Sequence, residues 1–267
     1  MDFLNKPSNT YPTIQVVRDG QEVPFSRYTN NEVIDDRYHF NQVVDPKKLG
    51  EVFSQERSSI RIFHAQRNIE KVAGWCRKFE AIFCCPVQAN IYLSPPESRG
   101  FGIHFDRHDV FVLQLEGAKN WKIYDSPIPF PLHGEQEPPQ EFVNRVGNAK
   151  CIYEGDLNKG DLLYVPKGYI HEVSSGSLPS IHITFGVRQL NGYDSIRKLV
   201  KSSHGNMSMR KSLPISAYQQ GAFEEYKRGL IRIVAETLDR EMDRMSTSFM
   251  SEERAVGVDQ IKQFYET

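Results

Sequence analysis

The central part of the chain, from Val87 to Val187, consists of short runs in which apolar and polar residues alternate. Such alternation is typical of strands with one buried face, and Pro, Gly and Asp separate the runs. Many short strands with regular turns predict an antiparallel barrel or sandwich of the jelly-roll class. The predicted strands are 87–93, 102–105, 110–116, 119–124, 150–154, 161–165, 170–174 and 180–187.

The pattern before this region is mixed. Two β-like pieces, Thr13–Val17 and Glu22–Phe25, flank Asp19-Gly20, a pair that favours a hairpin turn. Asp45-Pro46 is typical of an N-cap followed by proline at the first helical position, so we predict a short helix through about Gln55. A strand is predicted over Ser59–Phe63.

Helical spacing dominates two other regions. In 68–83 the apolar residues recur every three or four positions up to Pro86, which predicts an amphipathic helix packed on a larger body. A second apolar stripe predicts a helix over 217–245, and Ser251 is a candidate N-cap for a short last helix. The second stripe consists of Phe223, Tyr226, Leu230, Ile233, Val234, Leu238, Met242 and Met245.

Composition narrows the function classes. Hydrophobic residues are 39% and charged residues 25% of the 267 residues, and the net charge is −1, so neither nucleic acid nor an anionic membrane surface is an expected partner. We find no secretory signal and no apolar run long enough to span a bilayer. The cysteines, Cys76, Cys84, Cys85 and Cys151, lack CxxC spacing, and we expect reduced core thiols in a cytoplasmic protein.

Candidate metal chemistry lies in the triplet His104-Phe105-Asp106. Residues two apart on a strand face the same way, so His104 and Asp106 are expected to point to one side. The best third ligand is His171, which follows the turn and apolar strand of Gly160–Val165 and the bend at Pro166 and Gly168. Two histidines and one carboxylate form the facial triad that binds iron(II) and leaves positions open for a cosubstrate and oxygen.

Several stretches resemble one family. They are Asn90–Tyr92, the Pro-rich turn ending in Gly100–Gly102, His104–Asp106, Asp109–Trp121, Gly160–His171 and His182–Gly186. Over roughly residues 60–190 the sequence resembles JmjC-type cupin oxygenases, in the branch of the ribosomal oxygenases. The resemblance implies a double-stranded β-helix, iron(II), 2-oxoglutarate and O2, with His104, Asp106 and His171 as the metal ligands.

The same resemblance implies the cosubstrate contacts. A basic residue on the strand after the HxD triplet holds the distal carboxylate of 2-oxoglutarate in this branch, and alignment through Glu116-Gly117 and Trp121 makes it Lys119. A desolvated lysine facing a carboxylate is a strong charge-assisted pair. Tyr92 aligns with a tyrosine that hydrogen-bonds the same carboxylate, and Asn90 and Thr184 are expected near the site.

For the other histidines and aromatic residues, the sequence gives less support for a role in the site. His108 lies two residues after Asp106, and one interpretation places it at the substrate mouth, but we expect a polar turn residue. Trp121 and Phe111 are expected to belong to the barrel core. His182 is expected inside the barrel as a hydrogen-bonded core histidine. His39, His64, His133 and His204 have no supporting context, and the Pro/Glu-rich segment 126–140 is predicted to be a loop.

The predicted organisation has three parts: an N-terminal β and irregular extension with a short helix (1–58), the catalytic barrel with its packing helix (59–190), and a C-terminal helical region (191–267). The apolar stripe predicts a homodimer interface in the last part. Some members of the family add a winged-helix domain there, and we expect this chain to be too short to hold one.

The sequence predicts an iron(II)- and 2-oxoglutarate-dependent dioxygenase that hydroxylates an unactivated C–H bond in a protein or peptide. Two alternatives stay open: the same chemistry on a free amino acid or natural-product intermediate, and a cupin that binds metal or ligand without turnover. Demethylation of methyl-lysine follows the same chemistry, and no residue singles it out.

Overall fold

The computed structural model describes residues 3–4, 9–34, 38–125, 128–132, 139–210, 212 and 222–249. The chain divides into two compact units, which are Met1–Phe79 with Pro86–Arg188 and Glu80–Cys85 with Gln189–Thr267. Among the described residues, no helix combines the length and apolar character needed to cross a membrane.

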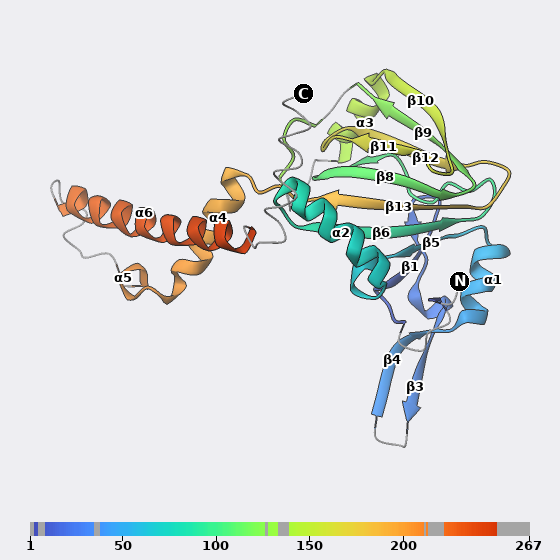
Figure 1. Cartoon of the computed structure of the whole chain (residues 1–267), viewed down its shortest axis with the longest axis horizontal. Helices are drawn as coiled ribbons and strands as arrows, with labels where there is room; N and C mark the ends of the chain where they lie inside the picture. Colours follow the sequence, from blue (N-terminus) through green and yellow to red (C-terminus); the bar gives the residue numbers. More distant parts are fainter. Residues whose placement is uncertain are drawn as a thin grey trace. The chain divides into compact units, whose positions relative to one another are not determined.

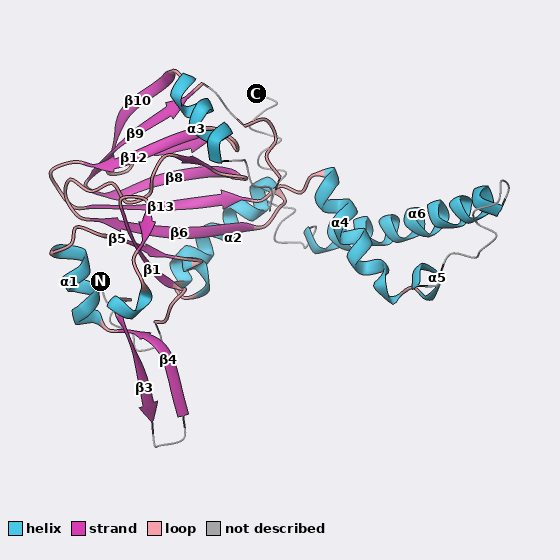
Figure 2. Ribbon diagram, turned by 180° about the vertical axis from the view of Figure 1, so that it is seen from behind, coloured by secondary structure: helices cyan, strands magenta, loops and turns pink. Residues whose placement is uncertain are grey.

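Strands β6 to β13 form the barrel of the first unit (Figures 1 and 2). One described sheet has the order β11-β8-β13-β6-β5-β1-β2, and the facing sheet has the order β10-β9-β12-β7. The chain therefore passes back and forth between two sheets, which is the double-stranded β-helix expected from the family resemblance. The bounds are β6 Val87–Ser94, β7 His104–Phe105, β8 Asp109–Glu116, β9 Ala118–Tyr124, β10 Cys151–Asn158, β11 Leu162–Val165, β12 Ile170–Ser175 and β13 Ser180–Val187.

Buried and half-buried side chains alternate along β9, and the buried ones point into the barrel. Lys119, Trp121 and Ile123 are buried, whereas the residues between them are half-buried. Trp121 and Ile123 pack in a core cluster with Val110, Val112, Leu157 and Val165. Because successive side chains of a strand point to opposite faces, burial of Trp121 and Ile123 also places Lys119 on the inner face.

The turn between β8 and β9 fixes where this alternation begins. Gly117 has φ +64, and a Cβ atom added there would lie 2.2 Å from the carbonyl oxygen of Pro179. Neither the backbone conformation nor the contact tolerates a side chain. Glycine at this position therefore fixes the residue at which β9 begins, and with it the face of the strand to which Lys119 and Trp121 point.

The outer face of the larger sheet carries aromatic contacts with α2 (Glu70–Phe83). Phe79 stacks on Phe185 with ring centroids 4.7 Å apart and lies 5.3 Å from Phe111. Phe111 was expected in the barrel core, and this expectation is wrong, because Phe111 alternates with the buried Val110 and Val112 and so faces outward.

The N-terminal elements extend the larger sheet and confirm most of the sequence pattern. Strands β1 (Ile14–Arg18) and β2 (Gln21–Glu22) form the expected hairpin, with positive φ at Asp19 and Gly20. The second predicted strand is too long, because the 3-10 turn η1 (Phe25–Arg27) occupies its end. The strand predicted over Ser59–Phe63 is present as β5 (Ser59–Ile62), which pairs with β1 on one side and β6 on the other.

Helix α1 (Pro46–Ser54) begins where the sequence predicts. The Asp45 carboxylate accepts hydrogen bonds from the backbone N–H groups of Lys47 and Lys48, at 2.9 and 3.2 Å, and Pro46 occupies the first helical position. The carboxylate accepts from two backbone N–H groups that have no partner within the first helical turn. Proline at the first position has no backbone N–H that would need a partner.

Two strands and one helix were not predicted. Strands β3 (Thr29–Ile34) and β4 (Tyr38–Val44) pair as a separate ribbon that projects from the barrel (Figure 1). The segment predicted as a loop over 126–140 leads into helix α3 (Pro139–Asn148), so the loop prediction is wrong at its end.

The second unit contains α4 (Gly192–Ser202), the 3-10 turn η3 (Ser203–Gly205), α5 (Met207–Arg210) and α6 (Ala222–Phe249). Helix α6 includes the predicted apolar stripe, and α4 packs against α6. The predicted last helix, from Ser251, lies outside the described residues.

Candidate metal centre

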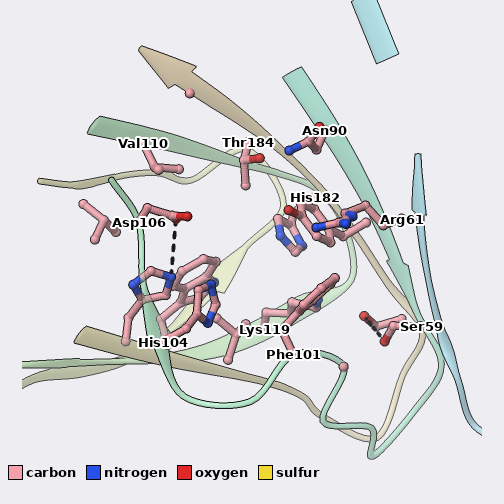
Figure 3. A pocket seen from close by; sticks show the side chains of 18 of the residues that line it. Ser59, Arg61, Asn90, Phe101, His104, Asp106, Val110, Lys119, His182 and Thr184 are labelled. Carbon is pink, nitrogen blue, oxygen red and sulfur yellow. Dashed lines mark hydrogen bonds and ion pairs between the residues drawn. The ribbon is translucent and has the colours of Figure 1, made fainter. Parts of the chain in front are cut away.

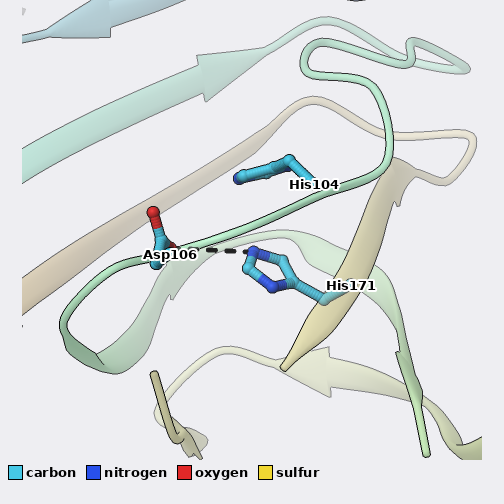
Figure 4. Close-up of side chains that lie close together, drawn as sticks. All are labelled: His104, Asp106 and His171. Carbon is cyan, nitrogen blue, oxygen red and sulfur yellow. Dashed lines mark ion pairs between the residues drawn. The ribbon is translucent and has the colours of Figure 1, made fainter. Parts of the chain in front are cut away.

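Strand pairing brings the three candidate metal ligands together. Strands β7 and β12 are antiparallel neighbours in which His104 lies opposite His171. Asp106 comes directly after β7, so the HxD triplet begins on a strand and ends beyond it. One potential ligand atom from each of the three side chains lies within 4.8 Å of the others (Figure 4).

Hydrogen bonds orient both imidazoles. The Nδ1 atom of His104 lies 2.8 Å from the carbonyl oxygen of Gly102, and Nδ1 of His171 lies 3.0 Å from that of Tyr169. Because a carbonyl only accepts, each Nδ1 carries a proton and donates, which leaves Nε2 as the ring atom available to a metal. Metal-bound histidines in proteins are oriented in this way.

The electrostatics also fit a cation. The His171 side chain is buried, and burial together with the neighbouring His104 lowers the pKa of His171 to about 4. Neutral imidazole is the form that binds metals. The Asp106 carboxylate lies 3.8 Å from Nε2 of His171 and supplies a negative charge at the same point. Two neutral imidazoles and one carboxylate are the ligand set of facial-triad iron(II) sites.

These residues line a cavity of about 260 Å³ inside the barrel. Figure 3 shows Asp106 and Val110 on one side of the cavity and Arg61 and Ser59 on the other, with Thr184 and His182 between them. The candidate metal centre therefore lies toward one end, and the cavity continues from it to a basic end.

Lys119 provides a buried positive charge toward this basic end. Its side chain is 6% exposed and lines the cavity, and burial lowers its pKa to about 7. Within the described part of the chain, its ammonium group has neither a hydrogen bond nor an ion pair. An uncompensated buried cation is costly unless an anion joins it. A carboxylate ligand fits this position.

The other predicted cosubstrate contacts lie on the neighbouring strands. Tyr92 and Asn90 on β6 line the cavity, and Thr184 on β13 is the cross-strand partner of Asn90. Burial raises the pKa of the Tyr92 hydroxyl, which therefore keeps its proton and can donate to a carboxylate. The Asn90 side-chain oxygen accepts a hydrogen bond from the backbone N–H of His64 at 3.0 Å.

Arg61 is a lining residue that the sequence did not single out. It enters from β5, bonds to the side-chain oxygen of Gln15 through Nε at 2.9 Å and through Nη2, and lies over the ring of Phe101 at 5.1 Å. The only feature of the sequence that points to Arg61 is its position, on a predicted strand within the stretch that resembles the family. Ser59 and Ser94, whose hydroxyls are 2.9 Å apart, line the same end.

The remaining histidines separate into interior and exterior groups. His182 is inside the barrel as expected, stacked on Tyr92 at 4.7 Å, but its Nδ1 has no hydrogen-bond partner among the described residues. His108 lies in the turn between β7 and β8, as expected, and its side chain also lines the cavity, which favours the alternative that it faces the substrate side. His39 and His204 are exposed, and His133 lies outside the described residues.

A family model for the JmjC domain matches residues 61–195, which is half of the chain. The chain belongs to the JmjC domain family. The matched residues contain every candidate ligand discussed above and every lining residue except Ser59.

Curated relatives extend the resemblance. The proteins called "Bifunctional lysine-specific demethylase and histidyl-hydroxylase NO66" are 34% identical over 60% of this JmjC chain in Drosophila grimshawi, and 31% identical over 72% of it in Brugia malayi. The match covers 23% and 28% of those proteins, so the chain spans about a quarter of the length of the relatives.

Solved structures show the same fold. Escherichia coli YcfD, a ribosomal oxygenase solved in complex with cobalt and 2-oxoglutarate, matches this JmjC chain with a TM-score of 0.54 and 18% identity over 89% of this chain and 59% of that one. Another YcfD structure gives a TM-score of 0.52 and 20% identity over 84% of this chain and 55% of that one.

Proposed function

We propose that this JmjC domain is an iron(II)- and 2-oxoglutarate-dependent oxygenase that hydroxylates a residue of a protein. The observation that carries the proposal is one cavity with His104, Asp106 and His171 at one end and the uncompensated cation of Lys119 toward the other. A ligand with a chelating group and a distal carboxylate matches both ends. The names of the NO66 and YcfD relatives support a protein substrate.

Each part of the site has a separate task. When bound, the metal and 2-oxoglutarate supply oxygen activation, with succinate and CO2 released and one oxygen atom inserted into a C–H bond. His104, Asp106 and His171 hold the metal on one face and leave the opposite positions free. Lys119 neutralises the distal carboxylate, and the protonated Tyr92 donates to it. The barrel walls keep water from the reacting centre.

The test uses the whole chain purified without oxygen. We expect added iron(II), 2-oxoglutarate and air to give succinate, and omission of iron to prevent it. Mass spectrometry of cell extract treated with the protein should find peptides heavier by one oxygen atom. Absence of iron-dependent succinate in the presence of extract contradicts the proposal. A product found only among small molecules assigns the same chemistry to a free metabolite instead.

We also propose that the second unit forms a homodimer. Tyr193, Ile196 and Val200 of α4 are more than half exposed and recur on one side of the helix, and Phe223 and Ile231 of α6 are exposed to a similar degree. Exposed apolar patches of this kind are typical of protein interfaces. Of the predicted stripe, Met242 and Met245 lie in the part of α6 whose side chains are not described, and Ile231 lies beside the stripe.

Light scattering tests this interface. We expect a mass of two chains at micromolar concentration, and a mass of one chain for a variant carrying Ile196→Glu and Val200→Glu, because two charges would be desolvated at the interface. Glu replacement of the exposed Leu178 in the first unit is the control and should leave the dimer intact. A single-chain mass for the unmodified protein contradicts the proposal.

A cytoplasmic location is a further part of the proposal. Cys76, Cys84, Cys85 and Cys151 form no disulfide, and the expectation of core thiols holds for the buried Cys76 and Cys85 but is wrong for the exposed Cys84 and Cys151. Free thiols persist in reducing compartments, which supports this location.

A further inference from the structure

The turn between β1 and β2 is attached to the loop over 95–103, which joins β6 to β7. The backbone N–H of Asp19 donates to the carbonyl oxygen of Arg99 at 3.0 Å. The backbone N–H of Gly20 donates to the carbonyl oxygen of Gly100 at 2.9 Å. Two successive backbone hydrogen bonds therefore fix this loop to a hairpin that is far from it in the sequence.

The turn and the loop are packed as closely as glycine allows. Gly20 has φ +78, and a Cβ atom added there would lie 3.3 Å from the backbone nitrogen of Gly102. On the β5 side of the loop, a Cβ atom added to Gly100 would lie 2.8 Å from Oγ of Ser59. Glycine in such places permits the close approach of another segment. The loop is therefore held by the β1–β2 turn and by β5.

The same loop contacts the candidate metal centre. The carbonyl oxygen of Gly102 accepts the hydrogen bond from Nδ1 of His104, at 2.8 Å, that orients this imidazole. The ring of Phe101 lies edge-on to Tyr92 at 5.4 Å and 6.4 Å from the ring of His104. The guanidinium of Arg61 lies over the same Phe101 ring at 5.1 Å. A shift of the loop would therefore move the support of a metal ligand and a wall of the cosubstrate end together.

Glycine does not fix the Gly102 carbonyl by itself. Gly102 is exposed, and glycine has more backbone freedom than any other residue. Its carbonyl oxygen stays in place because neighbouring backbone restrains it, and Gly20 is the neighbour in contact. Loss of a group that supports a metal-bound histidine costs about 10–100-fold in metal affinity or activity, so the position of this oxygen matters for the metal centre.

We infer that the β1–β2 turn is a positioning element of the metal centre. By holding the 95–103 loop, the turn fixes the Gly102 carbonyl oxygen and hence the imidazole of His104. The inference rests on the proposed function only in taking His104 as a metal ligand. Because the turn precedes the residues matched by the family model, the metal centre depends on a segment outside the matched domain.

Gly20→Ala tests the inference through metal binding. The added Cβ atom would be too close to the backbone of Gly102, so the loop must move by a few tenths of an ångström. We expect the dissociation constant for cobalt(II), titrated into the whole chain under nitrogen, to rise at least about threefold, less than for loss of the supporting group itself. The visible absorption bands of the bound cobalt should also shift, because they depend on the arrangement of the ligands.

Gly160→Ala is the matched control. Gly160 has φ +95 in the turn between β10 and β11, and no atom of the described residues lies within 4 Å of a Cβ atom added there. The control therefore has a similar backbone strain without the contact. We expect both variants to melt at a lower temperature than the unmodified protein, and only Gly20→Ala to change the affinity and the spectrum of cobalt.

Amide exchange in the unmodified protein is a second test, which applies even if Gly20→Ala does not fold. Coupling between two sites is reciprocal, so metal binding should stabilise the turn if the turn stabilises the metal centre. We expect zinc(II), a diamagnetic ion, to slow exchange of the Asp19 and Gly20 amides at least about threefold, measured by NMR. The Gly160 amide, which donates to the carbonyl oxygen of Gln114 at 2.9 Å, is the control and should exchange at an unchanged rate.

The outcomes distinguish this inference from the proposed function. An unchanged cobalt affinity and spectrum in folded Gly20→Ala, equal changes in both glycine variants, or zinc-independent exchange of the turn amides each overturns the inference alone. Failure of the unmodified protein to bind cobalt overturns both. Succinate formation with iron(II), 2-oxoglutarate and air is measured separately. A metal site that depends on Gly20 but gives no succinate supports the positioning role and contradicts the oxygenase.

Discussion

His104→Ala is expected to remove iron(II)-dependent succinate formation and to weaken metal binding by at least about a hundredfold. Loss of a group that only supports a ligand already costs about 10–100-fold in affinity or activity, and His104 is a proposed ligand itself. The variant keeps Asp106 and His171, but two protein ligands do not fix the facial geometry that leaves the remaining positions open. The measurements are a calorimetric titration with iron(II) under nitrogen and a succinate assay.

His204→Ala provides the matched control. His204 is exposed in η3 of the second unit and has no role in the proposed site, so its loss should leave metal affinity and turnover unchanged. Thermal melting of both variants checks that each is folded. Metal affinity close to that of the unmodified protein in a folded His104→Ala variant would contradict the assignment of His104 as a ligand.

The candidate metal residues could be predicted from the sequence because two local patterns point to them. The spacing of His104 and Asp106 predicted that both side chains point to one side of the chain, and the bend at Pro166 and Gly168 marked His171 as the third candidate. The partner register, His171 opposite His104, depends on strands far apart in the sequence, and the spacing argument left it open. The family resemblance supported His171 as the third ligand but did not predict this register.

Residues outside this local pattern were harder to predict. Arg61 enters the cavity because β5 pairs with β6, and no property of Ser59–Phe63 alone determines which face of that strand is inward. The same uncertainty of face explains the error at Phe111. Whether the side chain of His108 faces the cavity could not be decided from the sequence, because the space that Gly186 leaves for its ring is created by a strand far along the chain.

Lys119→Met is expected to have opposite effects on ligand binding and on the stability of the ligand-free protein. The carboxylate of 2-oxoglutarate would lose its buried ionic partner, and removal of one member of such a pair costs about 3–5 kcal/mol, or roughly 140–4,000-fold in affinity. Calorimetric titration with 2-oxoglutarate under nitrogen measures this loss. Lys122→Met is the matched control on the same strand, because Lys122 faces outward, pairs with Glu154 at 3.2 Å, and should not affect the affinity.

Without ligand, the same variant should be more stable than the unmodified protein, because burial lowers the pKa of Lys119 from 10.5 to about 7. Below pH 7 the folded protein carries the buried charge, and its free energy of unfolding is reduced by the full desolvation penalty. Between pH 7 and 10.5 the unfolded chain binds more protons than the folded one, so the unmodified protein gains stability as pH rises, by at most about 1.4 kcal/mol per pH unit. The stability advantage of Lys119→Met, measured by denaturant unfolding, should therefore be largest near pH 6 and decrease toward pH 10. An advantage that is absent at pH 6, or that grows with pH, would show that the Lys119 ammonium group is solvated, and the assignment of Lys119 as an uncompensated cation would then be wrong.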